Sequence, residues 1–343
     1  MKSKKLVFFI VVCILAVFLS TYQLDLYITR PGSAFELSPL VEVDGGDKDD
    51  EGTLSLMTVS MLTATPTLYV YAKLQDGYKI MKPEQVRSPH ESDEEYNVRQ
   101  LKLMSDSQIN ALQIAFERAE LPYEISNNGV FILHVLDGGA ADGILAPGDR
   151  ILSIDGNKFE SQNEFIDYLA DKKEGDQVEL QYERDDRKIT NTVALAPLPG
   201  TEERIGIGIS FVEDKSIMTT PEVKIESDEI GGPSAGFMFT LEVLNQLLEE
   251  DITKGYDIAG TGTMESDGSV GRIGGIDQKL MAADRDDIEI FFAPDDETDG
   301  DAESNYDLAK KTAEKIGTDM KVVPVKTIDD ALGYLEGLEE KQS

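Results

Sequence analysis

An uninterrupted apolar run from Leu6 to Leu19 is the feature that most restricts what this chain can fold into. Lysines at positions 2, 4 and 5 precede the run, and a weaker continuation ends at Asp25. A cleaved signal peptide and an uncleaved membrane anchor both begin in this way. No small-x-small cleavage site follows, and with its continuation the run approaches the ~20 residues that a spanning helix needs. We therefore expect residues 1–29 to form a cytoplasmic tip and a transmembrane anchor.

The anchor predicts where the rest of the chain lies. Because the lysines should stay in the cytoplasm, residues after about 30 should lie outside the cell. This predicts a single-pass protein of the cell membrane with extracellular domains. The single cysteine, Cys13, lies inside the apolar run, so residues 14–343 can form no disulfide, thiolate metal site or cysteine nucleophile.

The charge balance excludes one class of partner. Acidic residues outnumber basic ones by 66 to 32, which gives a net charge of −34. Phosphate binding needs clustered Lys and Arg, so no nucleic-acid partner is expected. Two acidic loops, at 44–52 and 295–300, superficially resemble calcium loops. Counted from Asp47 and from Asp295, the twelfth positions are Thr58 and Tyr306, where a calcium loop needs a bidentate acid, so no metal site is expected.

Length and periodicity predict the domain organisation. The chain is long enough for two globular domains. Residues 53–74, including the run at 68–71, have a strand-like pattern, and residues 94–119 carry an apolar stripe at helical spacing. Residues 121–197 are typical of a small β-rich module. After a boundary at 198–200 strands alternate with helices, which is typical of an α/β domain.

The β-rich module has a specific resemblance. A strand at Gly129-Val130-Phe131, a small-residue turn at 138–143, Pro-Gly-Asp-Arg-Ile at 147–151 and Ile-Asp-Gly at 154–156 follow one another. This succession resembles a PDZ domain of the bacterial protease-associated type. PDZ domains bind an extended peptide by adding it as a strand to a sheet edge. The resemblance implies that Gly129, Val130 and Phe131 lie where the carboxylate-binding loop meets that edge.

A glycine-bracketed serine carries the strongest chemical signal. In Gly232-Pro233-Ser234-Ala235-Gly236, small residues leave the hydroxyl exposed and let a substrate backbone approach closely. The apolar residues at 237–248 predict a helix that begins near Ser234, whose free N–H groups favour a developing oxyanion. The pentapeptide also fits the nucleophile elbow of α/β-hydrolases, but that fold requires a histidine after the serine. The two histidines, His90 and His134, lie before it, so a histidine triad in hydrolase order is excluded.

A lysine is the natural alternative base. No S-x-x-K pattern surrounds the serine, whereas Lys279 follows two glycines on a predicted short helix. Ile276, Leu280 and Ala283 form the apolar stripe of that helix, and Lys279 is three residues after Ile276, so it lies on the buried side. Partial desolvation lowers a lysine pKa from its usual value of ~10.4, and a neutral amine can accept a serine proton.

These segments together resemble the Lon-type peptidase domain. Gly-Pro-Ser-Ala-Gly, then Gly-Thr-Gly at 260–262, then Gly-Gly-Ile-x-x-Lys-Leu-x-Ala-Ala at 274–283, look like the Ser/Lys dyad of that family and its surroundings. The resemblance implies that Ser234 is the nucleophile, that Lys279 is the general base and that Thr261 orients the lysine. Gly232 and Gly236 are implied as supporting residues.

The chain departs from this family in two respects. The family often has an acid three residues before the serine, where this chain has Gly231, and neither Asp228 nor Glu229 is assigned as its substitute. A G-x-x-x-x-G-K-[ST] phosphate loop is absent from the sequence, so cleavage should be independent of ATP, and no cofactor is expected. Full Lon forms rings with the help of its ATP-driven module, so an oligomer is left open here.

The resemblance continues upstream. Met104-Ser105-Asp106-Ser107 and the alanines at 111, 115 and 119 look like the first helix of the Lon peptidase domain, with residues 54–70 as its opening strands. The implied fold is an α/β (α+β) Lon-type peptidase domain with an inserted β-rich PDZ domain and an N-terminal transmembrane helix. Its expected parts are the anchor at 1–29, opening strands and first helix at 30–120, the PDZ domain at 121–197 and the peptidase core at 200–338.

The ensemble resembles the membrane-bound, PDZ-containing Lon-like proteases of Gram-positive bacteria. It implies a serine endopeptidase that cleaves peptides or unstructured protein segments outside the membrane, with the PDZ module recruiting or positioning the substrate. Two alternatives stay open. The first is a PDZ-based binding or scaffold protein with an inactive Lon-like domain, and the second is a serine esterase or amidase of small molecules.

Overall fold

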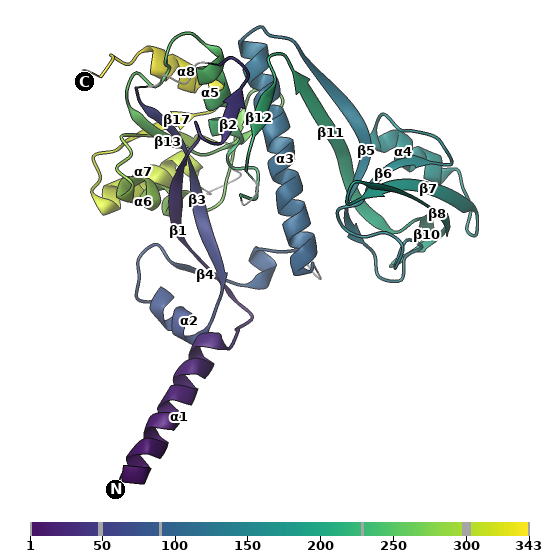
Figure 1. The fold of residues 1–343 in the computed structure, drawn as a ribbon, viewed down its shortest axis with the longest axis horizontal. Coiled ribbons are helices and arrows are strands. Elements are labelled where there is room, and N and C mark those ends of the chain that lie inside the picture. Colours follow the sequence, from purple (N-terminus) through teal and green to yellow (C-terminus); the bar gives the residue numbers. More distant parts are fainter. Residues whose placement is uncertain (1, 47–50, 89–90, 228–229, 297–302, 342–343) are drawn as a thin grey trace. The chain divides into compact units, whose positions relative to one another are not determined.

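The computed structural model describes residues 2–46, 51–88, 91–227, 230–296 and 303–341, which form two compact units (Figure 1). The first unit contains residues 1–90, 224–226 and 234–343, and the second contains residues 91–223 and 227–233. The chain therefore leaves the first unit after residue 90, touches it again at 224–226 and returns to it at residue 234. Parts of both acidic loops, together with His90, Asp228 and Glu229, lie outside the described residues.

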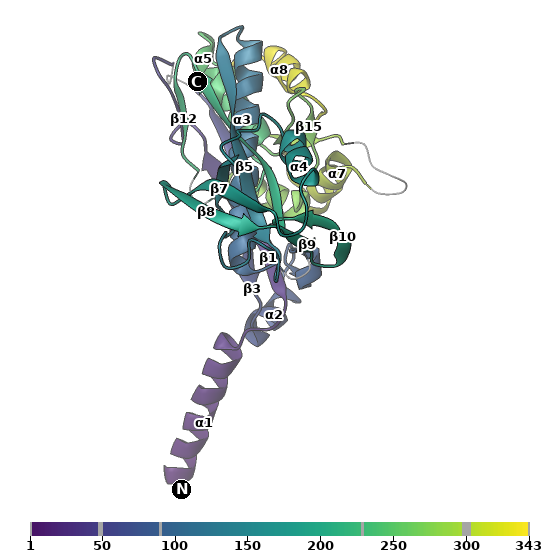
Figure 2. The same cartoon turned by 90° about the vertical axis from the view of Figure 1, so that its right-hand side faces the viewer.

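The apolar run forms helix α1 (Lys2–Thr21), which projects from the first unit (Figure 2). Its segment Lys4–Thr21 has a mean hydropathy of 2.3, and none of it is buried. By length and composition it can cross a membrane, although a signal sequence has the same properties. The helix ends before the expected limit at residue 29, because Tyr27 already begins a strand.

The first unit is built on one six-stranded sheet. Residues from both ends of the chain share it, since the N-terminal strand β3 (Thr53–Thr63) pairs in parallel with β13 (Asp257–Gly260). The neighbours on either side continue the sheet in the order β17, β16, β13, β3, β1, β4. The remaining strands are β1 (Tyr27–Glu36), β4 (Lys79–Met81), β16 (Ile290–Pro294) and β17 (Lys321–Val325).

Helices cover both faces of this sheet. Consecutive residues of a strand face opposite sides, and Phe291 and Phe292 in β16 show what lies on each. Phe292 packs edge-to-face against Phe237 of α5 (Gly236–Leu247) and Tyr334 of α8 (Ile328–Glu336). Phe291 joins a buried cluster with α6 (Ile276–Arg285) and α7 (Asn305–Ile316). This is the layered α/β arrangement that the alternation after residue 200 predicts.

One predicted strand is a helix. Residues 68–71 belong to α2 (Pro66–Ala72), not to a continuation of β3. The reason is the local start signal: the Thr65 side chain accepts a hydrogen bond from the Leu68 N–H, and Pro66 occupies the first turn. The short elements of this unit are β2 (Val41–Val43), η1 (Pro83–Gln85), β12 (Val223–Ile225, its last two residues in this unit), β14 (Thr263–Met264) and β15 (Val270–Gly271).

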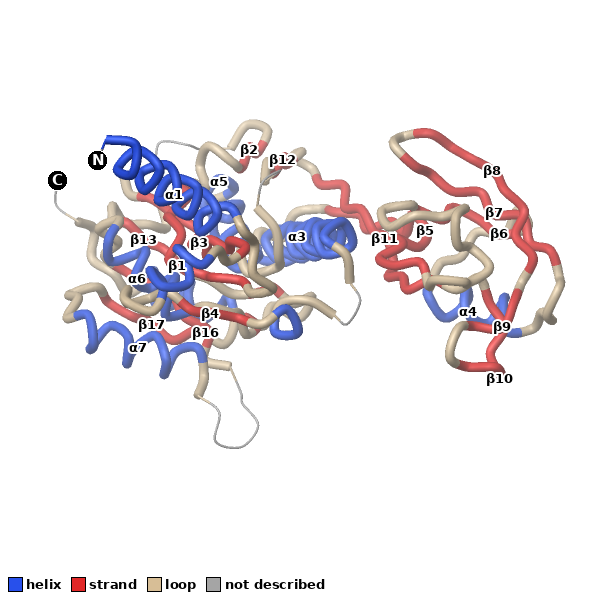
Figure 3. Tube along the Cα trace, turned by 90° about the horizontal axis from the view of Figure 1, so that it is seen from below, coloured by secondary structure: helices blue, strands red, loops and turns tan. Residues whose placement is uncertain are grey.

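The second unit combines a long helix, α3 (Asp93–Arg118), with a five-stranded antiparallel sheet (Figure 3). The helix confirms the stripe predicted at 94–119. The sheet has the order β11, β5, β6, β7, β8. Its strands are β5 (Tyr123–Val135), β6 (Arg150–Ile154), β7 (Gln177–Arg184), β8 (Arg187–Ala194) and β11 (Ile209–Thr219), with β9 (Ala196–Leu198) and β10 (Thr201–Gly206) as a separate hairpin.

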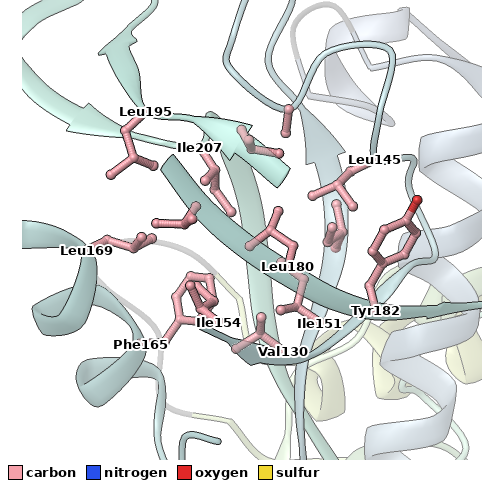
Figure 4. Close-up of a cluster of buried hydrophobic side chains, with 14 residues drawn as sticks. Val130, Leu145, Ile151, Ile154, Phe165, Leu169, Leu180, Tyr182, Leu195 and Ile207 are labelled. Carbon is pink, nitrogen blue, oxygen red and sulfur yellow. The ribbon is translucent and has the colours of Figure 1, made fainter. Parts of the chain in front are cut away.

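An apolar cluster holds the sheet and α4 of this unit together. Alternate residues of the strands point inward, and α4 (Gln162–Ala170) closes the core with Phe165 and Leu169 (Figure 4). Ile154, Phe165 and Leu180 are among the fully buried members. The expected boundaries at residues 120 and 197 both fall inside this unit. The physical reason is that β11, up to Thr219, pairs along its length with β5.

Candidate active site

Ser234 lies in the turn that leads into α5. Gly232 enters the turn with a φ of +88°, in the left-handed region that glycine adopts without steric cost. Ala235 caps α5, which begins at Gly236, so the helix predicted near Ser234 is confirmed. Among the described residues, the N–H groups of Ser234 and Ala235 have no hydrogen-bond acceptor. These two donors, beside the positive end of the helix dipole, are therefore free to bind an anionic oxygen.

Lys279 lies on the buried side of α6, as its sequence position predicts. Ile276, Leu280 and Ala283 are fully or almost fully buried, and Lys279 itself is only 3% exposed. Gly275 caps the helix with a φ of +70°. A Cβ at that position would lie 2.9 Å from a methyl group of Val59 in β3, so glycine lets α6 begin close against the sheet.

The structure brings Ser234, Lys279 and Thr261 together. The Nζ atom of Lys279 is 2.8 Å from the Oγ of Ser234 and 2.8 Å from the Oγ1 of Thr261. The Thr261 hydroxyl donates to the backbone carbonyl of Ser234, with an O–O distance of 3.0 Å. The lysine amine is thus held between two hydroxyl oxygens.

Backbone hydrogen bonds fix the serine turn to the end of β13. Thr261 follows the carboxyl end of this strand, and Gly262 N–H donates to Ser234 O at 3.0 Å. Phe237 N–H donates back to Gly262 O at 3.2 Å. A Cβ on Gly262 would lie 2.4 Å from Val270 Cγ1, so this close approach requires glycine. The Gly-Thr-Gly segment therefore positions both the threonine and the serine.

Burial makes Lys279 an unusual lysine. Desolvation lowers its pKa from 10.5 to about 7, because a charged ammonium is poorly stabilised away from water. Among the described residues no carboxylate forms an ion pair with it, so nothing offsets that penalty. Near neutral pH a large fraction of the amine is unprotonated and able to accept a proton. Within the same residues, no group of three or more His, Cys, Asp or Glu side chains is placed to hold a metal ion.

Gly129, Val130 and Phe131 do not lie at a free sheet edge, so that expectation is wrong. They occupy the middle of β5, which is paired with β11 on one side and β6 on the other. A Cβ on Gly129 would lie 2.1 Å from the carbonyl oxygen of Ile151, so this glycine permits the close approach of β5 and β6. Strand addition at these residues is blocked because both sides of β5 are already hydrogen-bonded.

A groove elsewhere in the second unit has the open edge instead. It has a volume of about 430 Å³ and lies between α4 and the beginning of β11, the outermost strand of the sheet on that side. Its apolar lining includes Phe165, Ile166 and Leu169 from α4 and Phe211 from β11. The segment 206–209, Gly-Ile-Gly-Ile, forms its end. In the part of the chain that the structure describes, no strand pairs with the outer edge of β11, so the groove combines an open strand edge with apolar walls.

Sequence reasoning missed two sets of residues. The first is the Gly-Ile-Gly-Ile segment, whose alternation of small and branched residues was the available signal but falls after the expected boundary at 197. The second is on α3, where Ser107 donates a hydrogen bond to Pro233 O at 2.9 Å and the backbone carbonyl of Gln100 accepts one from Gly232 N–H at 3.0 Å. A helical stripe shows which face is buried and cannot show which loop it contacts.

Comparison with known proteins agrees with both parts of this description. Residues 110–195 match the PDZ domain family, and residues 188–336 match the family described as the Lon protease (S16) C-terminal proteolytic domain. A solved structure of the PDZ domain of the SdrC-like protein from Listeria monocytogenes is 38% identical. It covers 26% of this chain and 93% of that chain, with a TM-score of 0.24.

Curated relatives are Lon proteases. The enzyme of Xanthomonas oryzae pv. oryzae is 32% identical over 146 residues, which is 42% of this chain and 16% of the relative. The enzyme of Escherichia coli is 30% identical over 140 residues, 40% of this chain and 16% of the relative. The matched part is thus about a sixth of the length of each relative. Together the matches show a PDZ domain and a Lon-type C-terminal proteolytic domain in one chain, and the latter family indicates a serine peptidase.

Proposed function

We propose that this chain is a serine endopeptidase in which Ser234 is the nucleophile and Lys279 the general base. The observation that carries the proposal is the 2.8 Å approach of Lys279 Nζ to Ser234 Oγ, made by a buried amine whose pKa is lowered to about 7. A lysine with an ordinary pKa would be protonated and unable to take the serine proton. Desolvation removes that obstacle at physiological pH.

The hydrogen bonds around Lys279 determine which proton its lone pair can accept. A neutral amine has two N–H protons and one lone pair. The proton of the Thr261 hydroxyl is already donated to Ser234 O, so the threonine oxygen accepts from Lys279. The lysine lone pair is then directed at the Ser234 hydroxyl. Thr261 therefore orients the base without touching the substrate.

The reaction follows from this arrangement. As Ser234 Oγ attacks the scissile carbonyl carbon, its proton passes to Lys279 Nζ, and the carbonyl electrons move onto oxygen. The N–H groups of Ser234 and Ala235 stabilise that oxyanion. The C–N bond then breaks, and the Lys279 ammonium gives its proton to the leaving amine. Lys279 next takes a proton from water as the water oxygen attacks the acyl carbon; the bond from that carbon to Ser234 Oγ then breaks, and Lys279 returns the proton to Oγ.

The substrate in this proposal is a peptide or an unstructured protein segment. Only an extended chain can align with the free edge of β11, so the groove between α4 and β11 selects for unfolded segments and recruits them. The N-terminal tip and helix α1, which ends at Thr21, hold the protein in the membrane, with the rest of the chain outside. Cleavage in this proposal is independent of ATP, since residues 1–343 contain no phosphate-loop motif.

Three variants test the dyad in the full chain, reconstituted in lipid nanodiscs without ATP. Ser234→Ala and Lys279→Ala should each abolish hydrolysis of a peptide library, whereas Lys310→Ala, at an exposed position on α7, should leave it unchanged. Covalent labelling of Ser234 by a fluorophosphonate should also require Lys279. Hydrolysis retained by either dyad variant would contradict the assignment.

The groove also suits a binding protein with an inactive peptidase domain. That alternative gives no reason for Lys279, because an amine buried without a counter-charge lowers stability and contributes nothing to a scaffold. The labelling experiment separates the two, since a scaffold leaves Ser234 unlabelled. A small-molecule esterase or amidase would instead turn over simple esters and leave the peptide library uncut.

A further inference from the structure

Helix α3 uses two opposite faces within the second unit. At about 100° per residue, Gln100 and Ser107 lie on one face, and Glu95 and Lys102 lie on the other. The face of Glu95 and Lys102 contacts the sheet: Glu95 contacts His134 of β5, and Lys102 lies 3.3 Å from the carboxylate of Asp214 in β11. The face of Gln100 and Ser107 contacts the loop 227–233. The helix is therefore a rigid connection between the sheet and the loop that ends directly before Ser234.

The contacts with that loop are close and polar. Gly232 N–H donates to the Gln100 carbonyl at 3.0 Å, Ser107 Oγ–H donates to Pro233 O at 2.9 Å, and Gln108 Nε2 donates to Ser227 Oγ at 2.7 Å. A Cβ on Gly232 would lie 3.0 Å from the Gln100 side chain. The end of the Gln100 side chain can move aside, so the φ of +88° and not this contact is what favours glycine at position 232.

Ser107 departs from the usual behaviour of a hydroxyl inside a helix. Such a hydroxyl commonly donates to the carbonyl four residues earlier. Thr240 in α5 and Thr312 in α7 do this, bonding Gly236 O and Leu308 O. Ser107 is 3% exposed and donates instead to Pro233 O, outside its own helix. The Ser107 hydroxyl therefore donates its hydrogen bond to the loop 227–233 and not to a carbonyl of α3.

We infer that Ser107 is a positioning residue that aims the oxyanion-binding N–H of Ser234; this rests on the proposed Ser234 chemistry. The Pro233–Ser234 peptide is planar, so the Ser234 N–H points opposite to the Pro233 carbonyl. By fixing that carbonyl toward α3, Ser107 fixes the direction of the N–H. The same hydrogen bond polarises the peptide, which makes the N–H a better donor.

Ion pairs on the opposite face of α3 hold the helix to the sheet. We call the hydrogen bond from Ser107 to Pro233 O, together with this attachment of α3, the clamp. Lys102 is 5% exposed and bonds both Asp106 and Asp214, while its Nζ lies 5.7 Å from the ring centre of Phe131 in β5. Arg150 of β6 pairs with the same Asp214. Because α3 is held to two strands, β5 and β11, its Ser107 face cannot rotate independently of the sheet.

Ser107→Ala in the full chain tests this role, with Ser105→Ala, exposed on the same helix, as the matched control. Ser107→Ala should lower kcat about tenfold, because losing an oxyanion donor outright costs ~10²–10³ and misdirecting one costs less. KM should change by less than about twofold. The pH midpoint of kcat should stay in place, since no contact of Lys279 is altered. Ser107→Cys, an isosteric variant with a weak donor, should lie between alanine and wild type.

A second measurement does not depend on turnover. In protein labelled with ¹⁵N-serine and ¹⁵N-alanine, Ser107→Ala should shift the Ser234 and Ala235 amide resonances, and Ser105→Ala should not. Unchanged kcat in Ser107→Ala, a moved pH midpoint, or unmoved amide resonances would overturn the inference. Absence of any Ser234-dependent hydrolysis in the wild type would instead overturn the proposed function, and the amide resonances would still decide whether the clamp exists.

Discussion

The Nζ of Lys279 lies 2.8 Å from the Oγ of Ser234, although 45 positions separate the two residues in the chain. The contact joins the beginning of α5 to the first turns of α6, through a turn held to the end of β13. It requires the buried lysine to be neutral when it accepts a proton. In the proposed mechanism the titration of Lys279 therefore controls activity, and its desolvation makes stability depend on pH as well.

The activity of the wild type should rise with pH and level off above about 8. Lys279 acts as a base only when unprotonated, and its pKa is lowered to about 7 by desolvation. A plot of kcat/KM against pH between about 5.5 and 9 should therefore have its midpoint near 7. Lys279→Arg should be inactive throughout, since a guanidinium stays protonated. A flat profile across this range would contradict lysine as the base.

Lys279→Met should stabilise the protein, most strongly at and below neutral pH. Between pH about 7 and 10.5 the unfolded chain binds a proton at Lys279 that the folded chain does not, so wild-type stability rises with pH. The slope is roughly 1.4 kcal/mol per pH unit. Methionine binds no proton, so the variant lacks this pH dependence. Its unfolding free energy should therefore exceed that of the wild type by a large amount at pH 7 and by a small amount near pH 10. Equal gains in urea unfolding at both values would show that the lysine is not desolvated.

Much of the site followed from the sequence because its chemistry is local. The glycine-bracketed serine, the position of Lys279 on the buried stripe of a short helix and the lack of a later histidine each come from a few neighbouring residues. The spatial contact is now seen, whereas the catalytic roles stay a prediction for the variants to test. The layered α/β sheet followed in the same way, from alternating strand and helix patterns after residue 200.

Most of the features that the sequence did not predict correctly depend on contacts between residues far apart in the chain. A strand pattern at Gly129–Phe131 does not show whether its edges are free, and β11 occupies one of them from more than 70 residues later in the chain. The helix α2 was missed because its aromatic and β-branched residues favour a strand, while the capping by Thr65 and Pro66 decided otherwise. The contact of Ser107 with Pro233 joins positions 126 apart and leaves no periodic signal.

Thr261→Val should reduce kcat by roughly 10- to 100-fold, the usual cost of misplacing a catalytic group by about 1 Å. Valine has the same shape but cannot accept the lysine N–H, so the amine loses its orientation. The fold should survive, because Ser234 O keeps its hydrogen bond from Gly262 N–H. Thr261→Ser retains the hydroxyl and should keep most of the activity. Equal activity in the valine and serine variants would exclude an orienting role.

Asp214→Ala should destabilise the second unit by about 3 kcal/mol. The variant removes the buried partner shared by Lys102 and Arg150, which leaves each cation only a more exposed carboxylate, Asp106 or Glu183. Asp106→Ala is the matched control, since Asp106 also pairs with Lys102 but its side chain is 42% exposed, and it should cost less than about 1 kcal/mol. Urea unfolding followed by circular dichroism measures both. Similar losses in the two variants would show that burial of the Asp214 network is unimportant.

Ile166→Glu should weaken peptide capture by the groove and leave the reactivity of Ser234 unchanged. Ile166 lines the groove from α4 but is exposed, so a carboxylate there spares the core while repelling apolar or acidic peptide side chains. Asp167→Ala, exposed on the same helix and outside the lining, is the control. Fluorescence anisotropy of labelled peptides should show at least a roughly tenfold weaker Kd for the glutamate variant only. Fluorophosphonate labelling should proceed at the wild-type rate in both. Unaltered peptide affinity in Ile166→Glu would place substrate recruitment elsewhere in the chain.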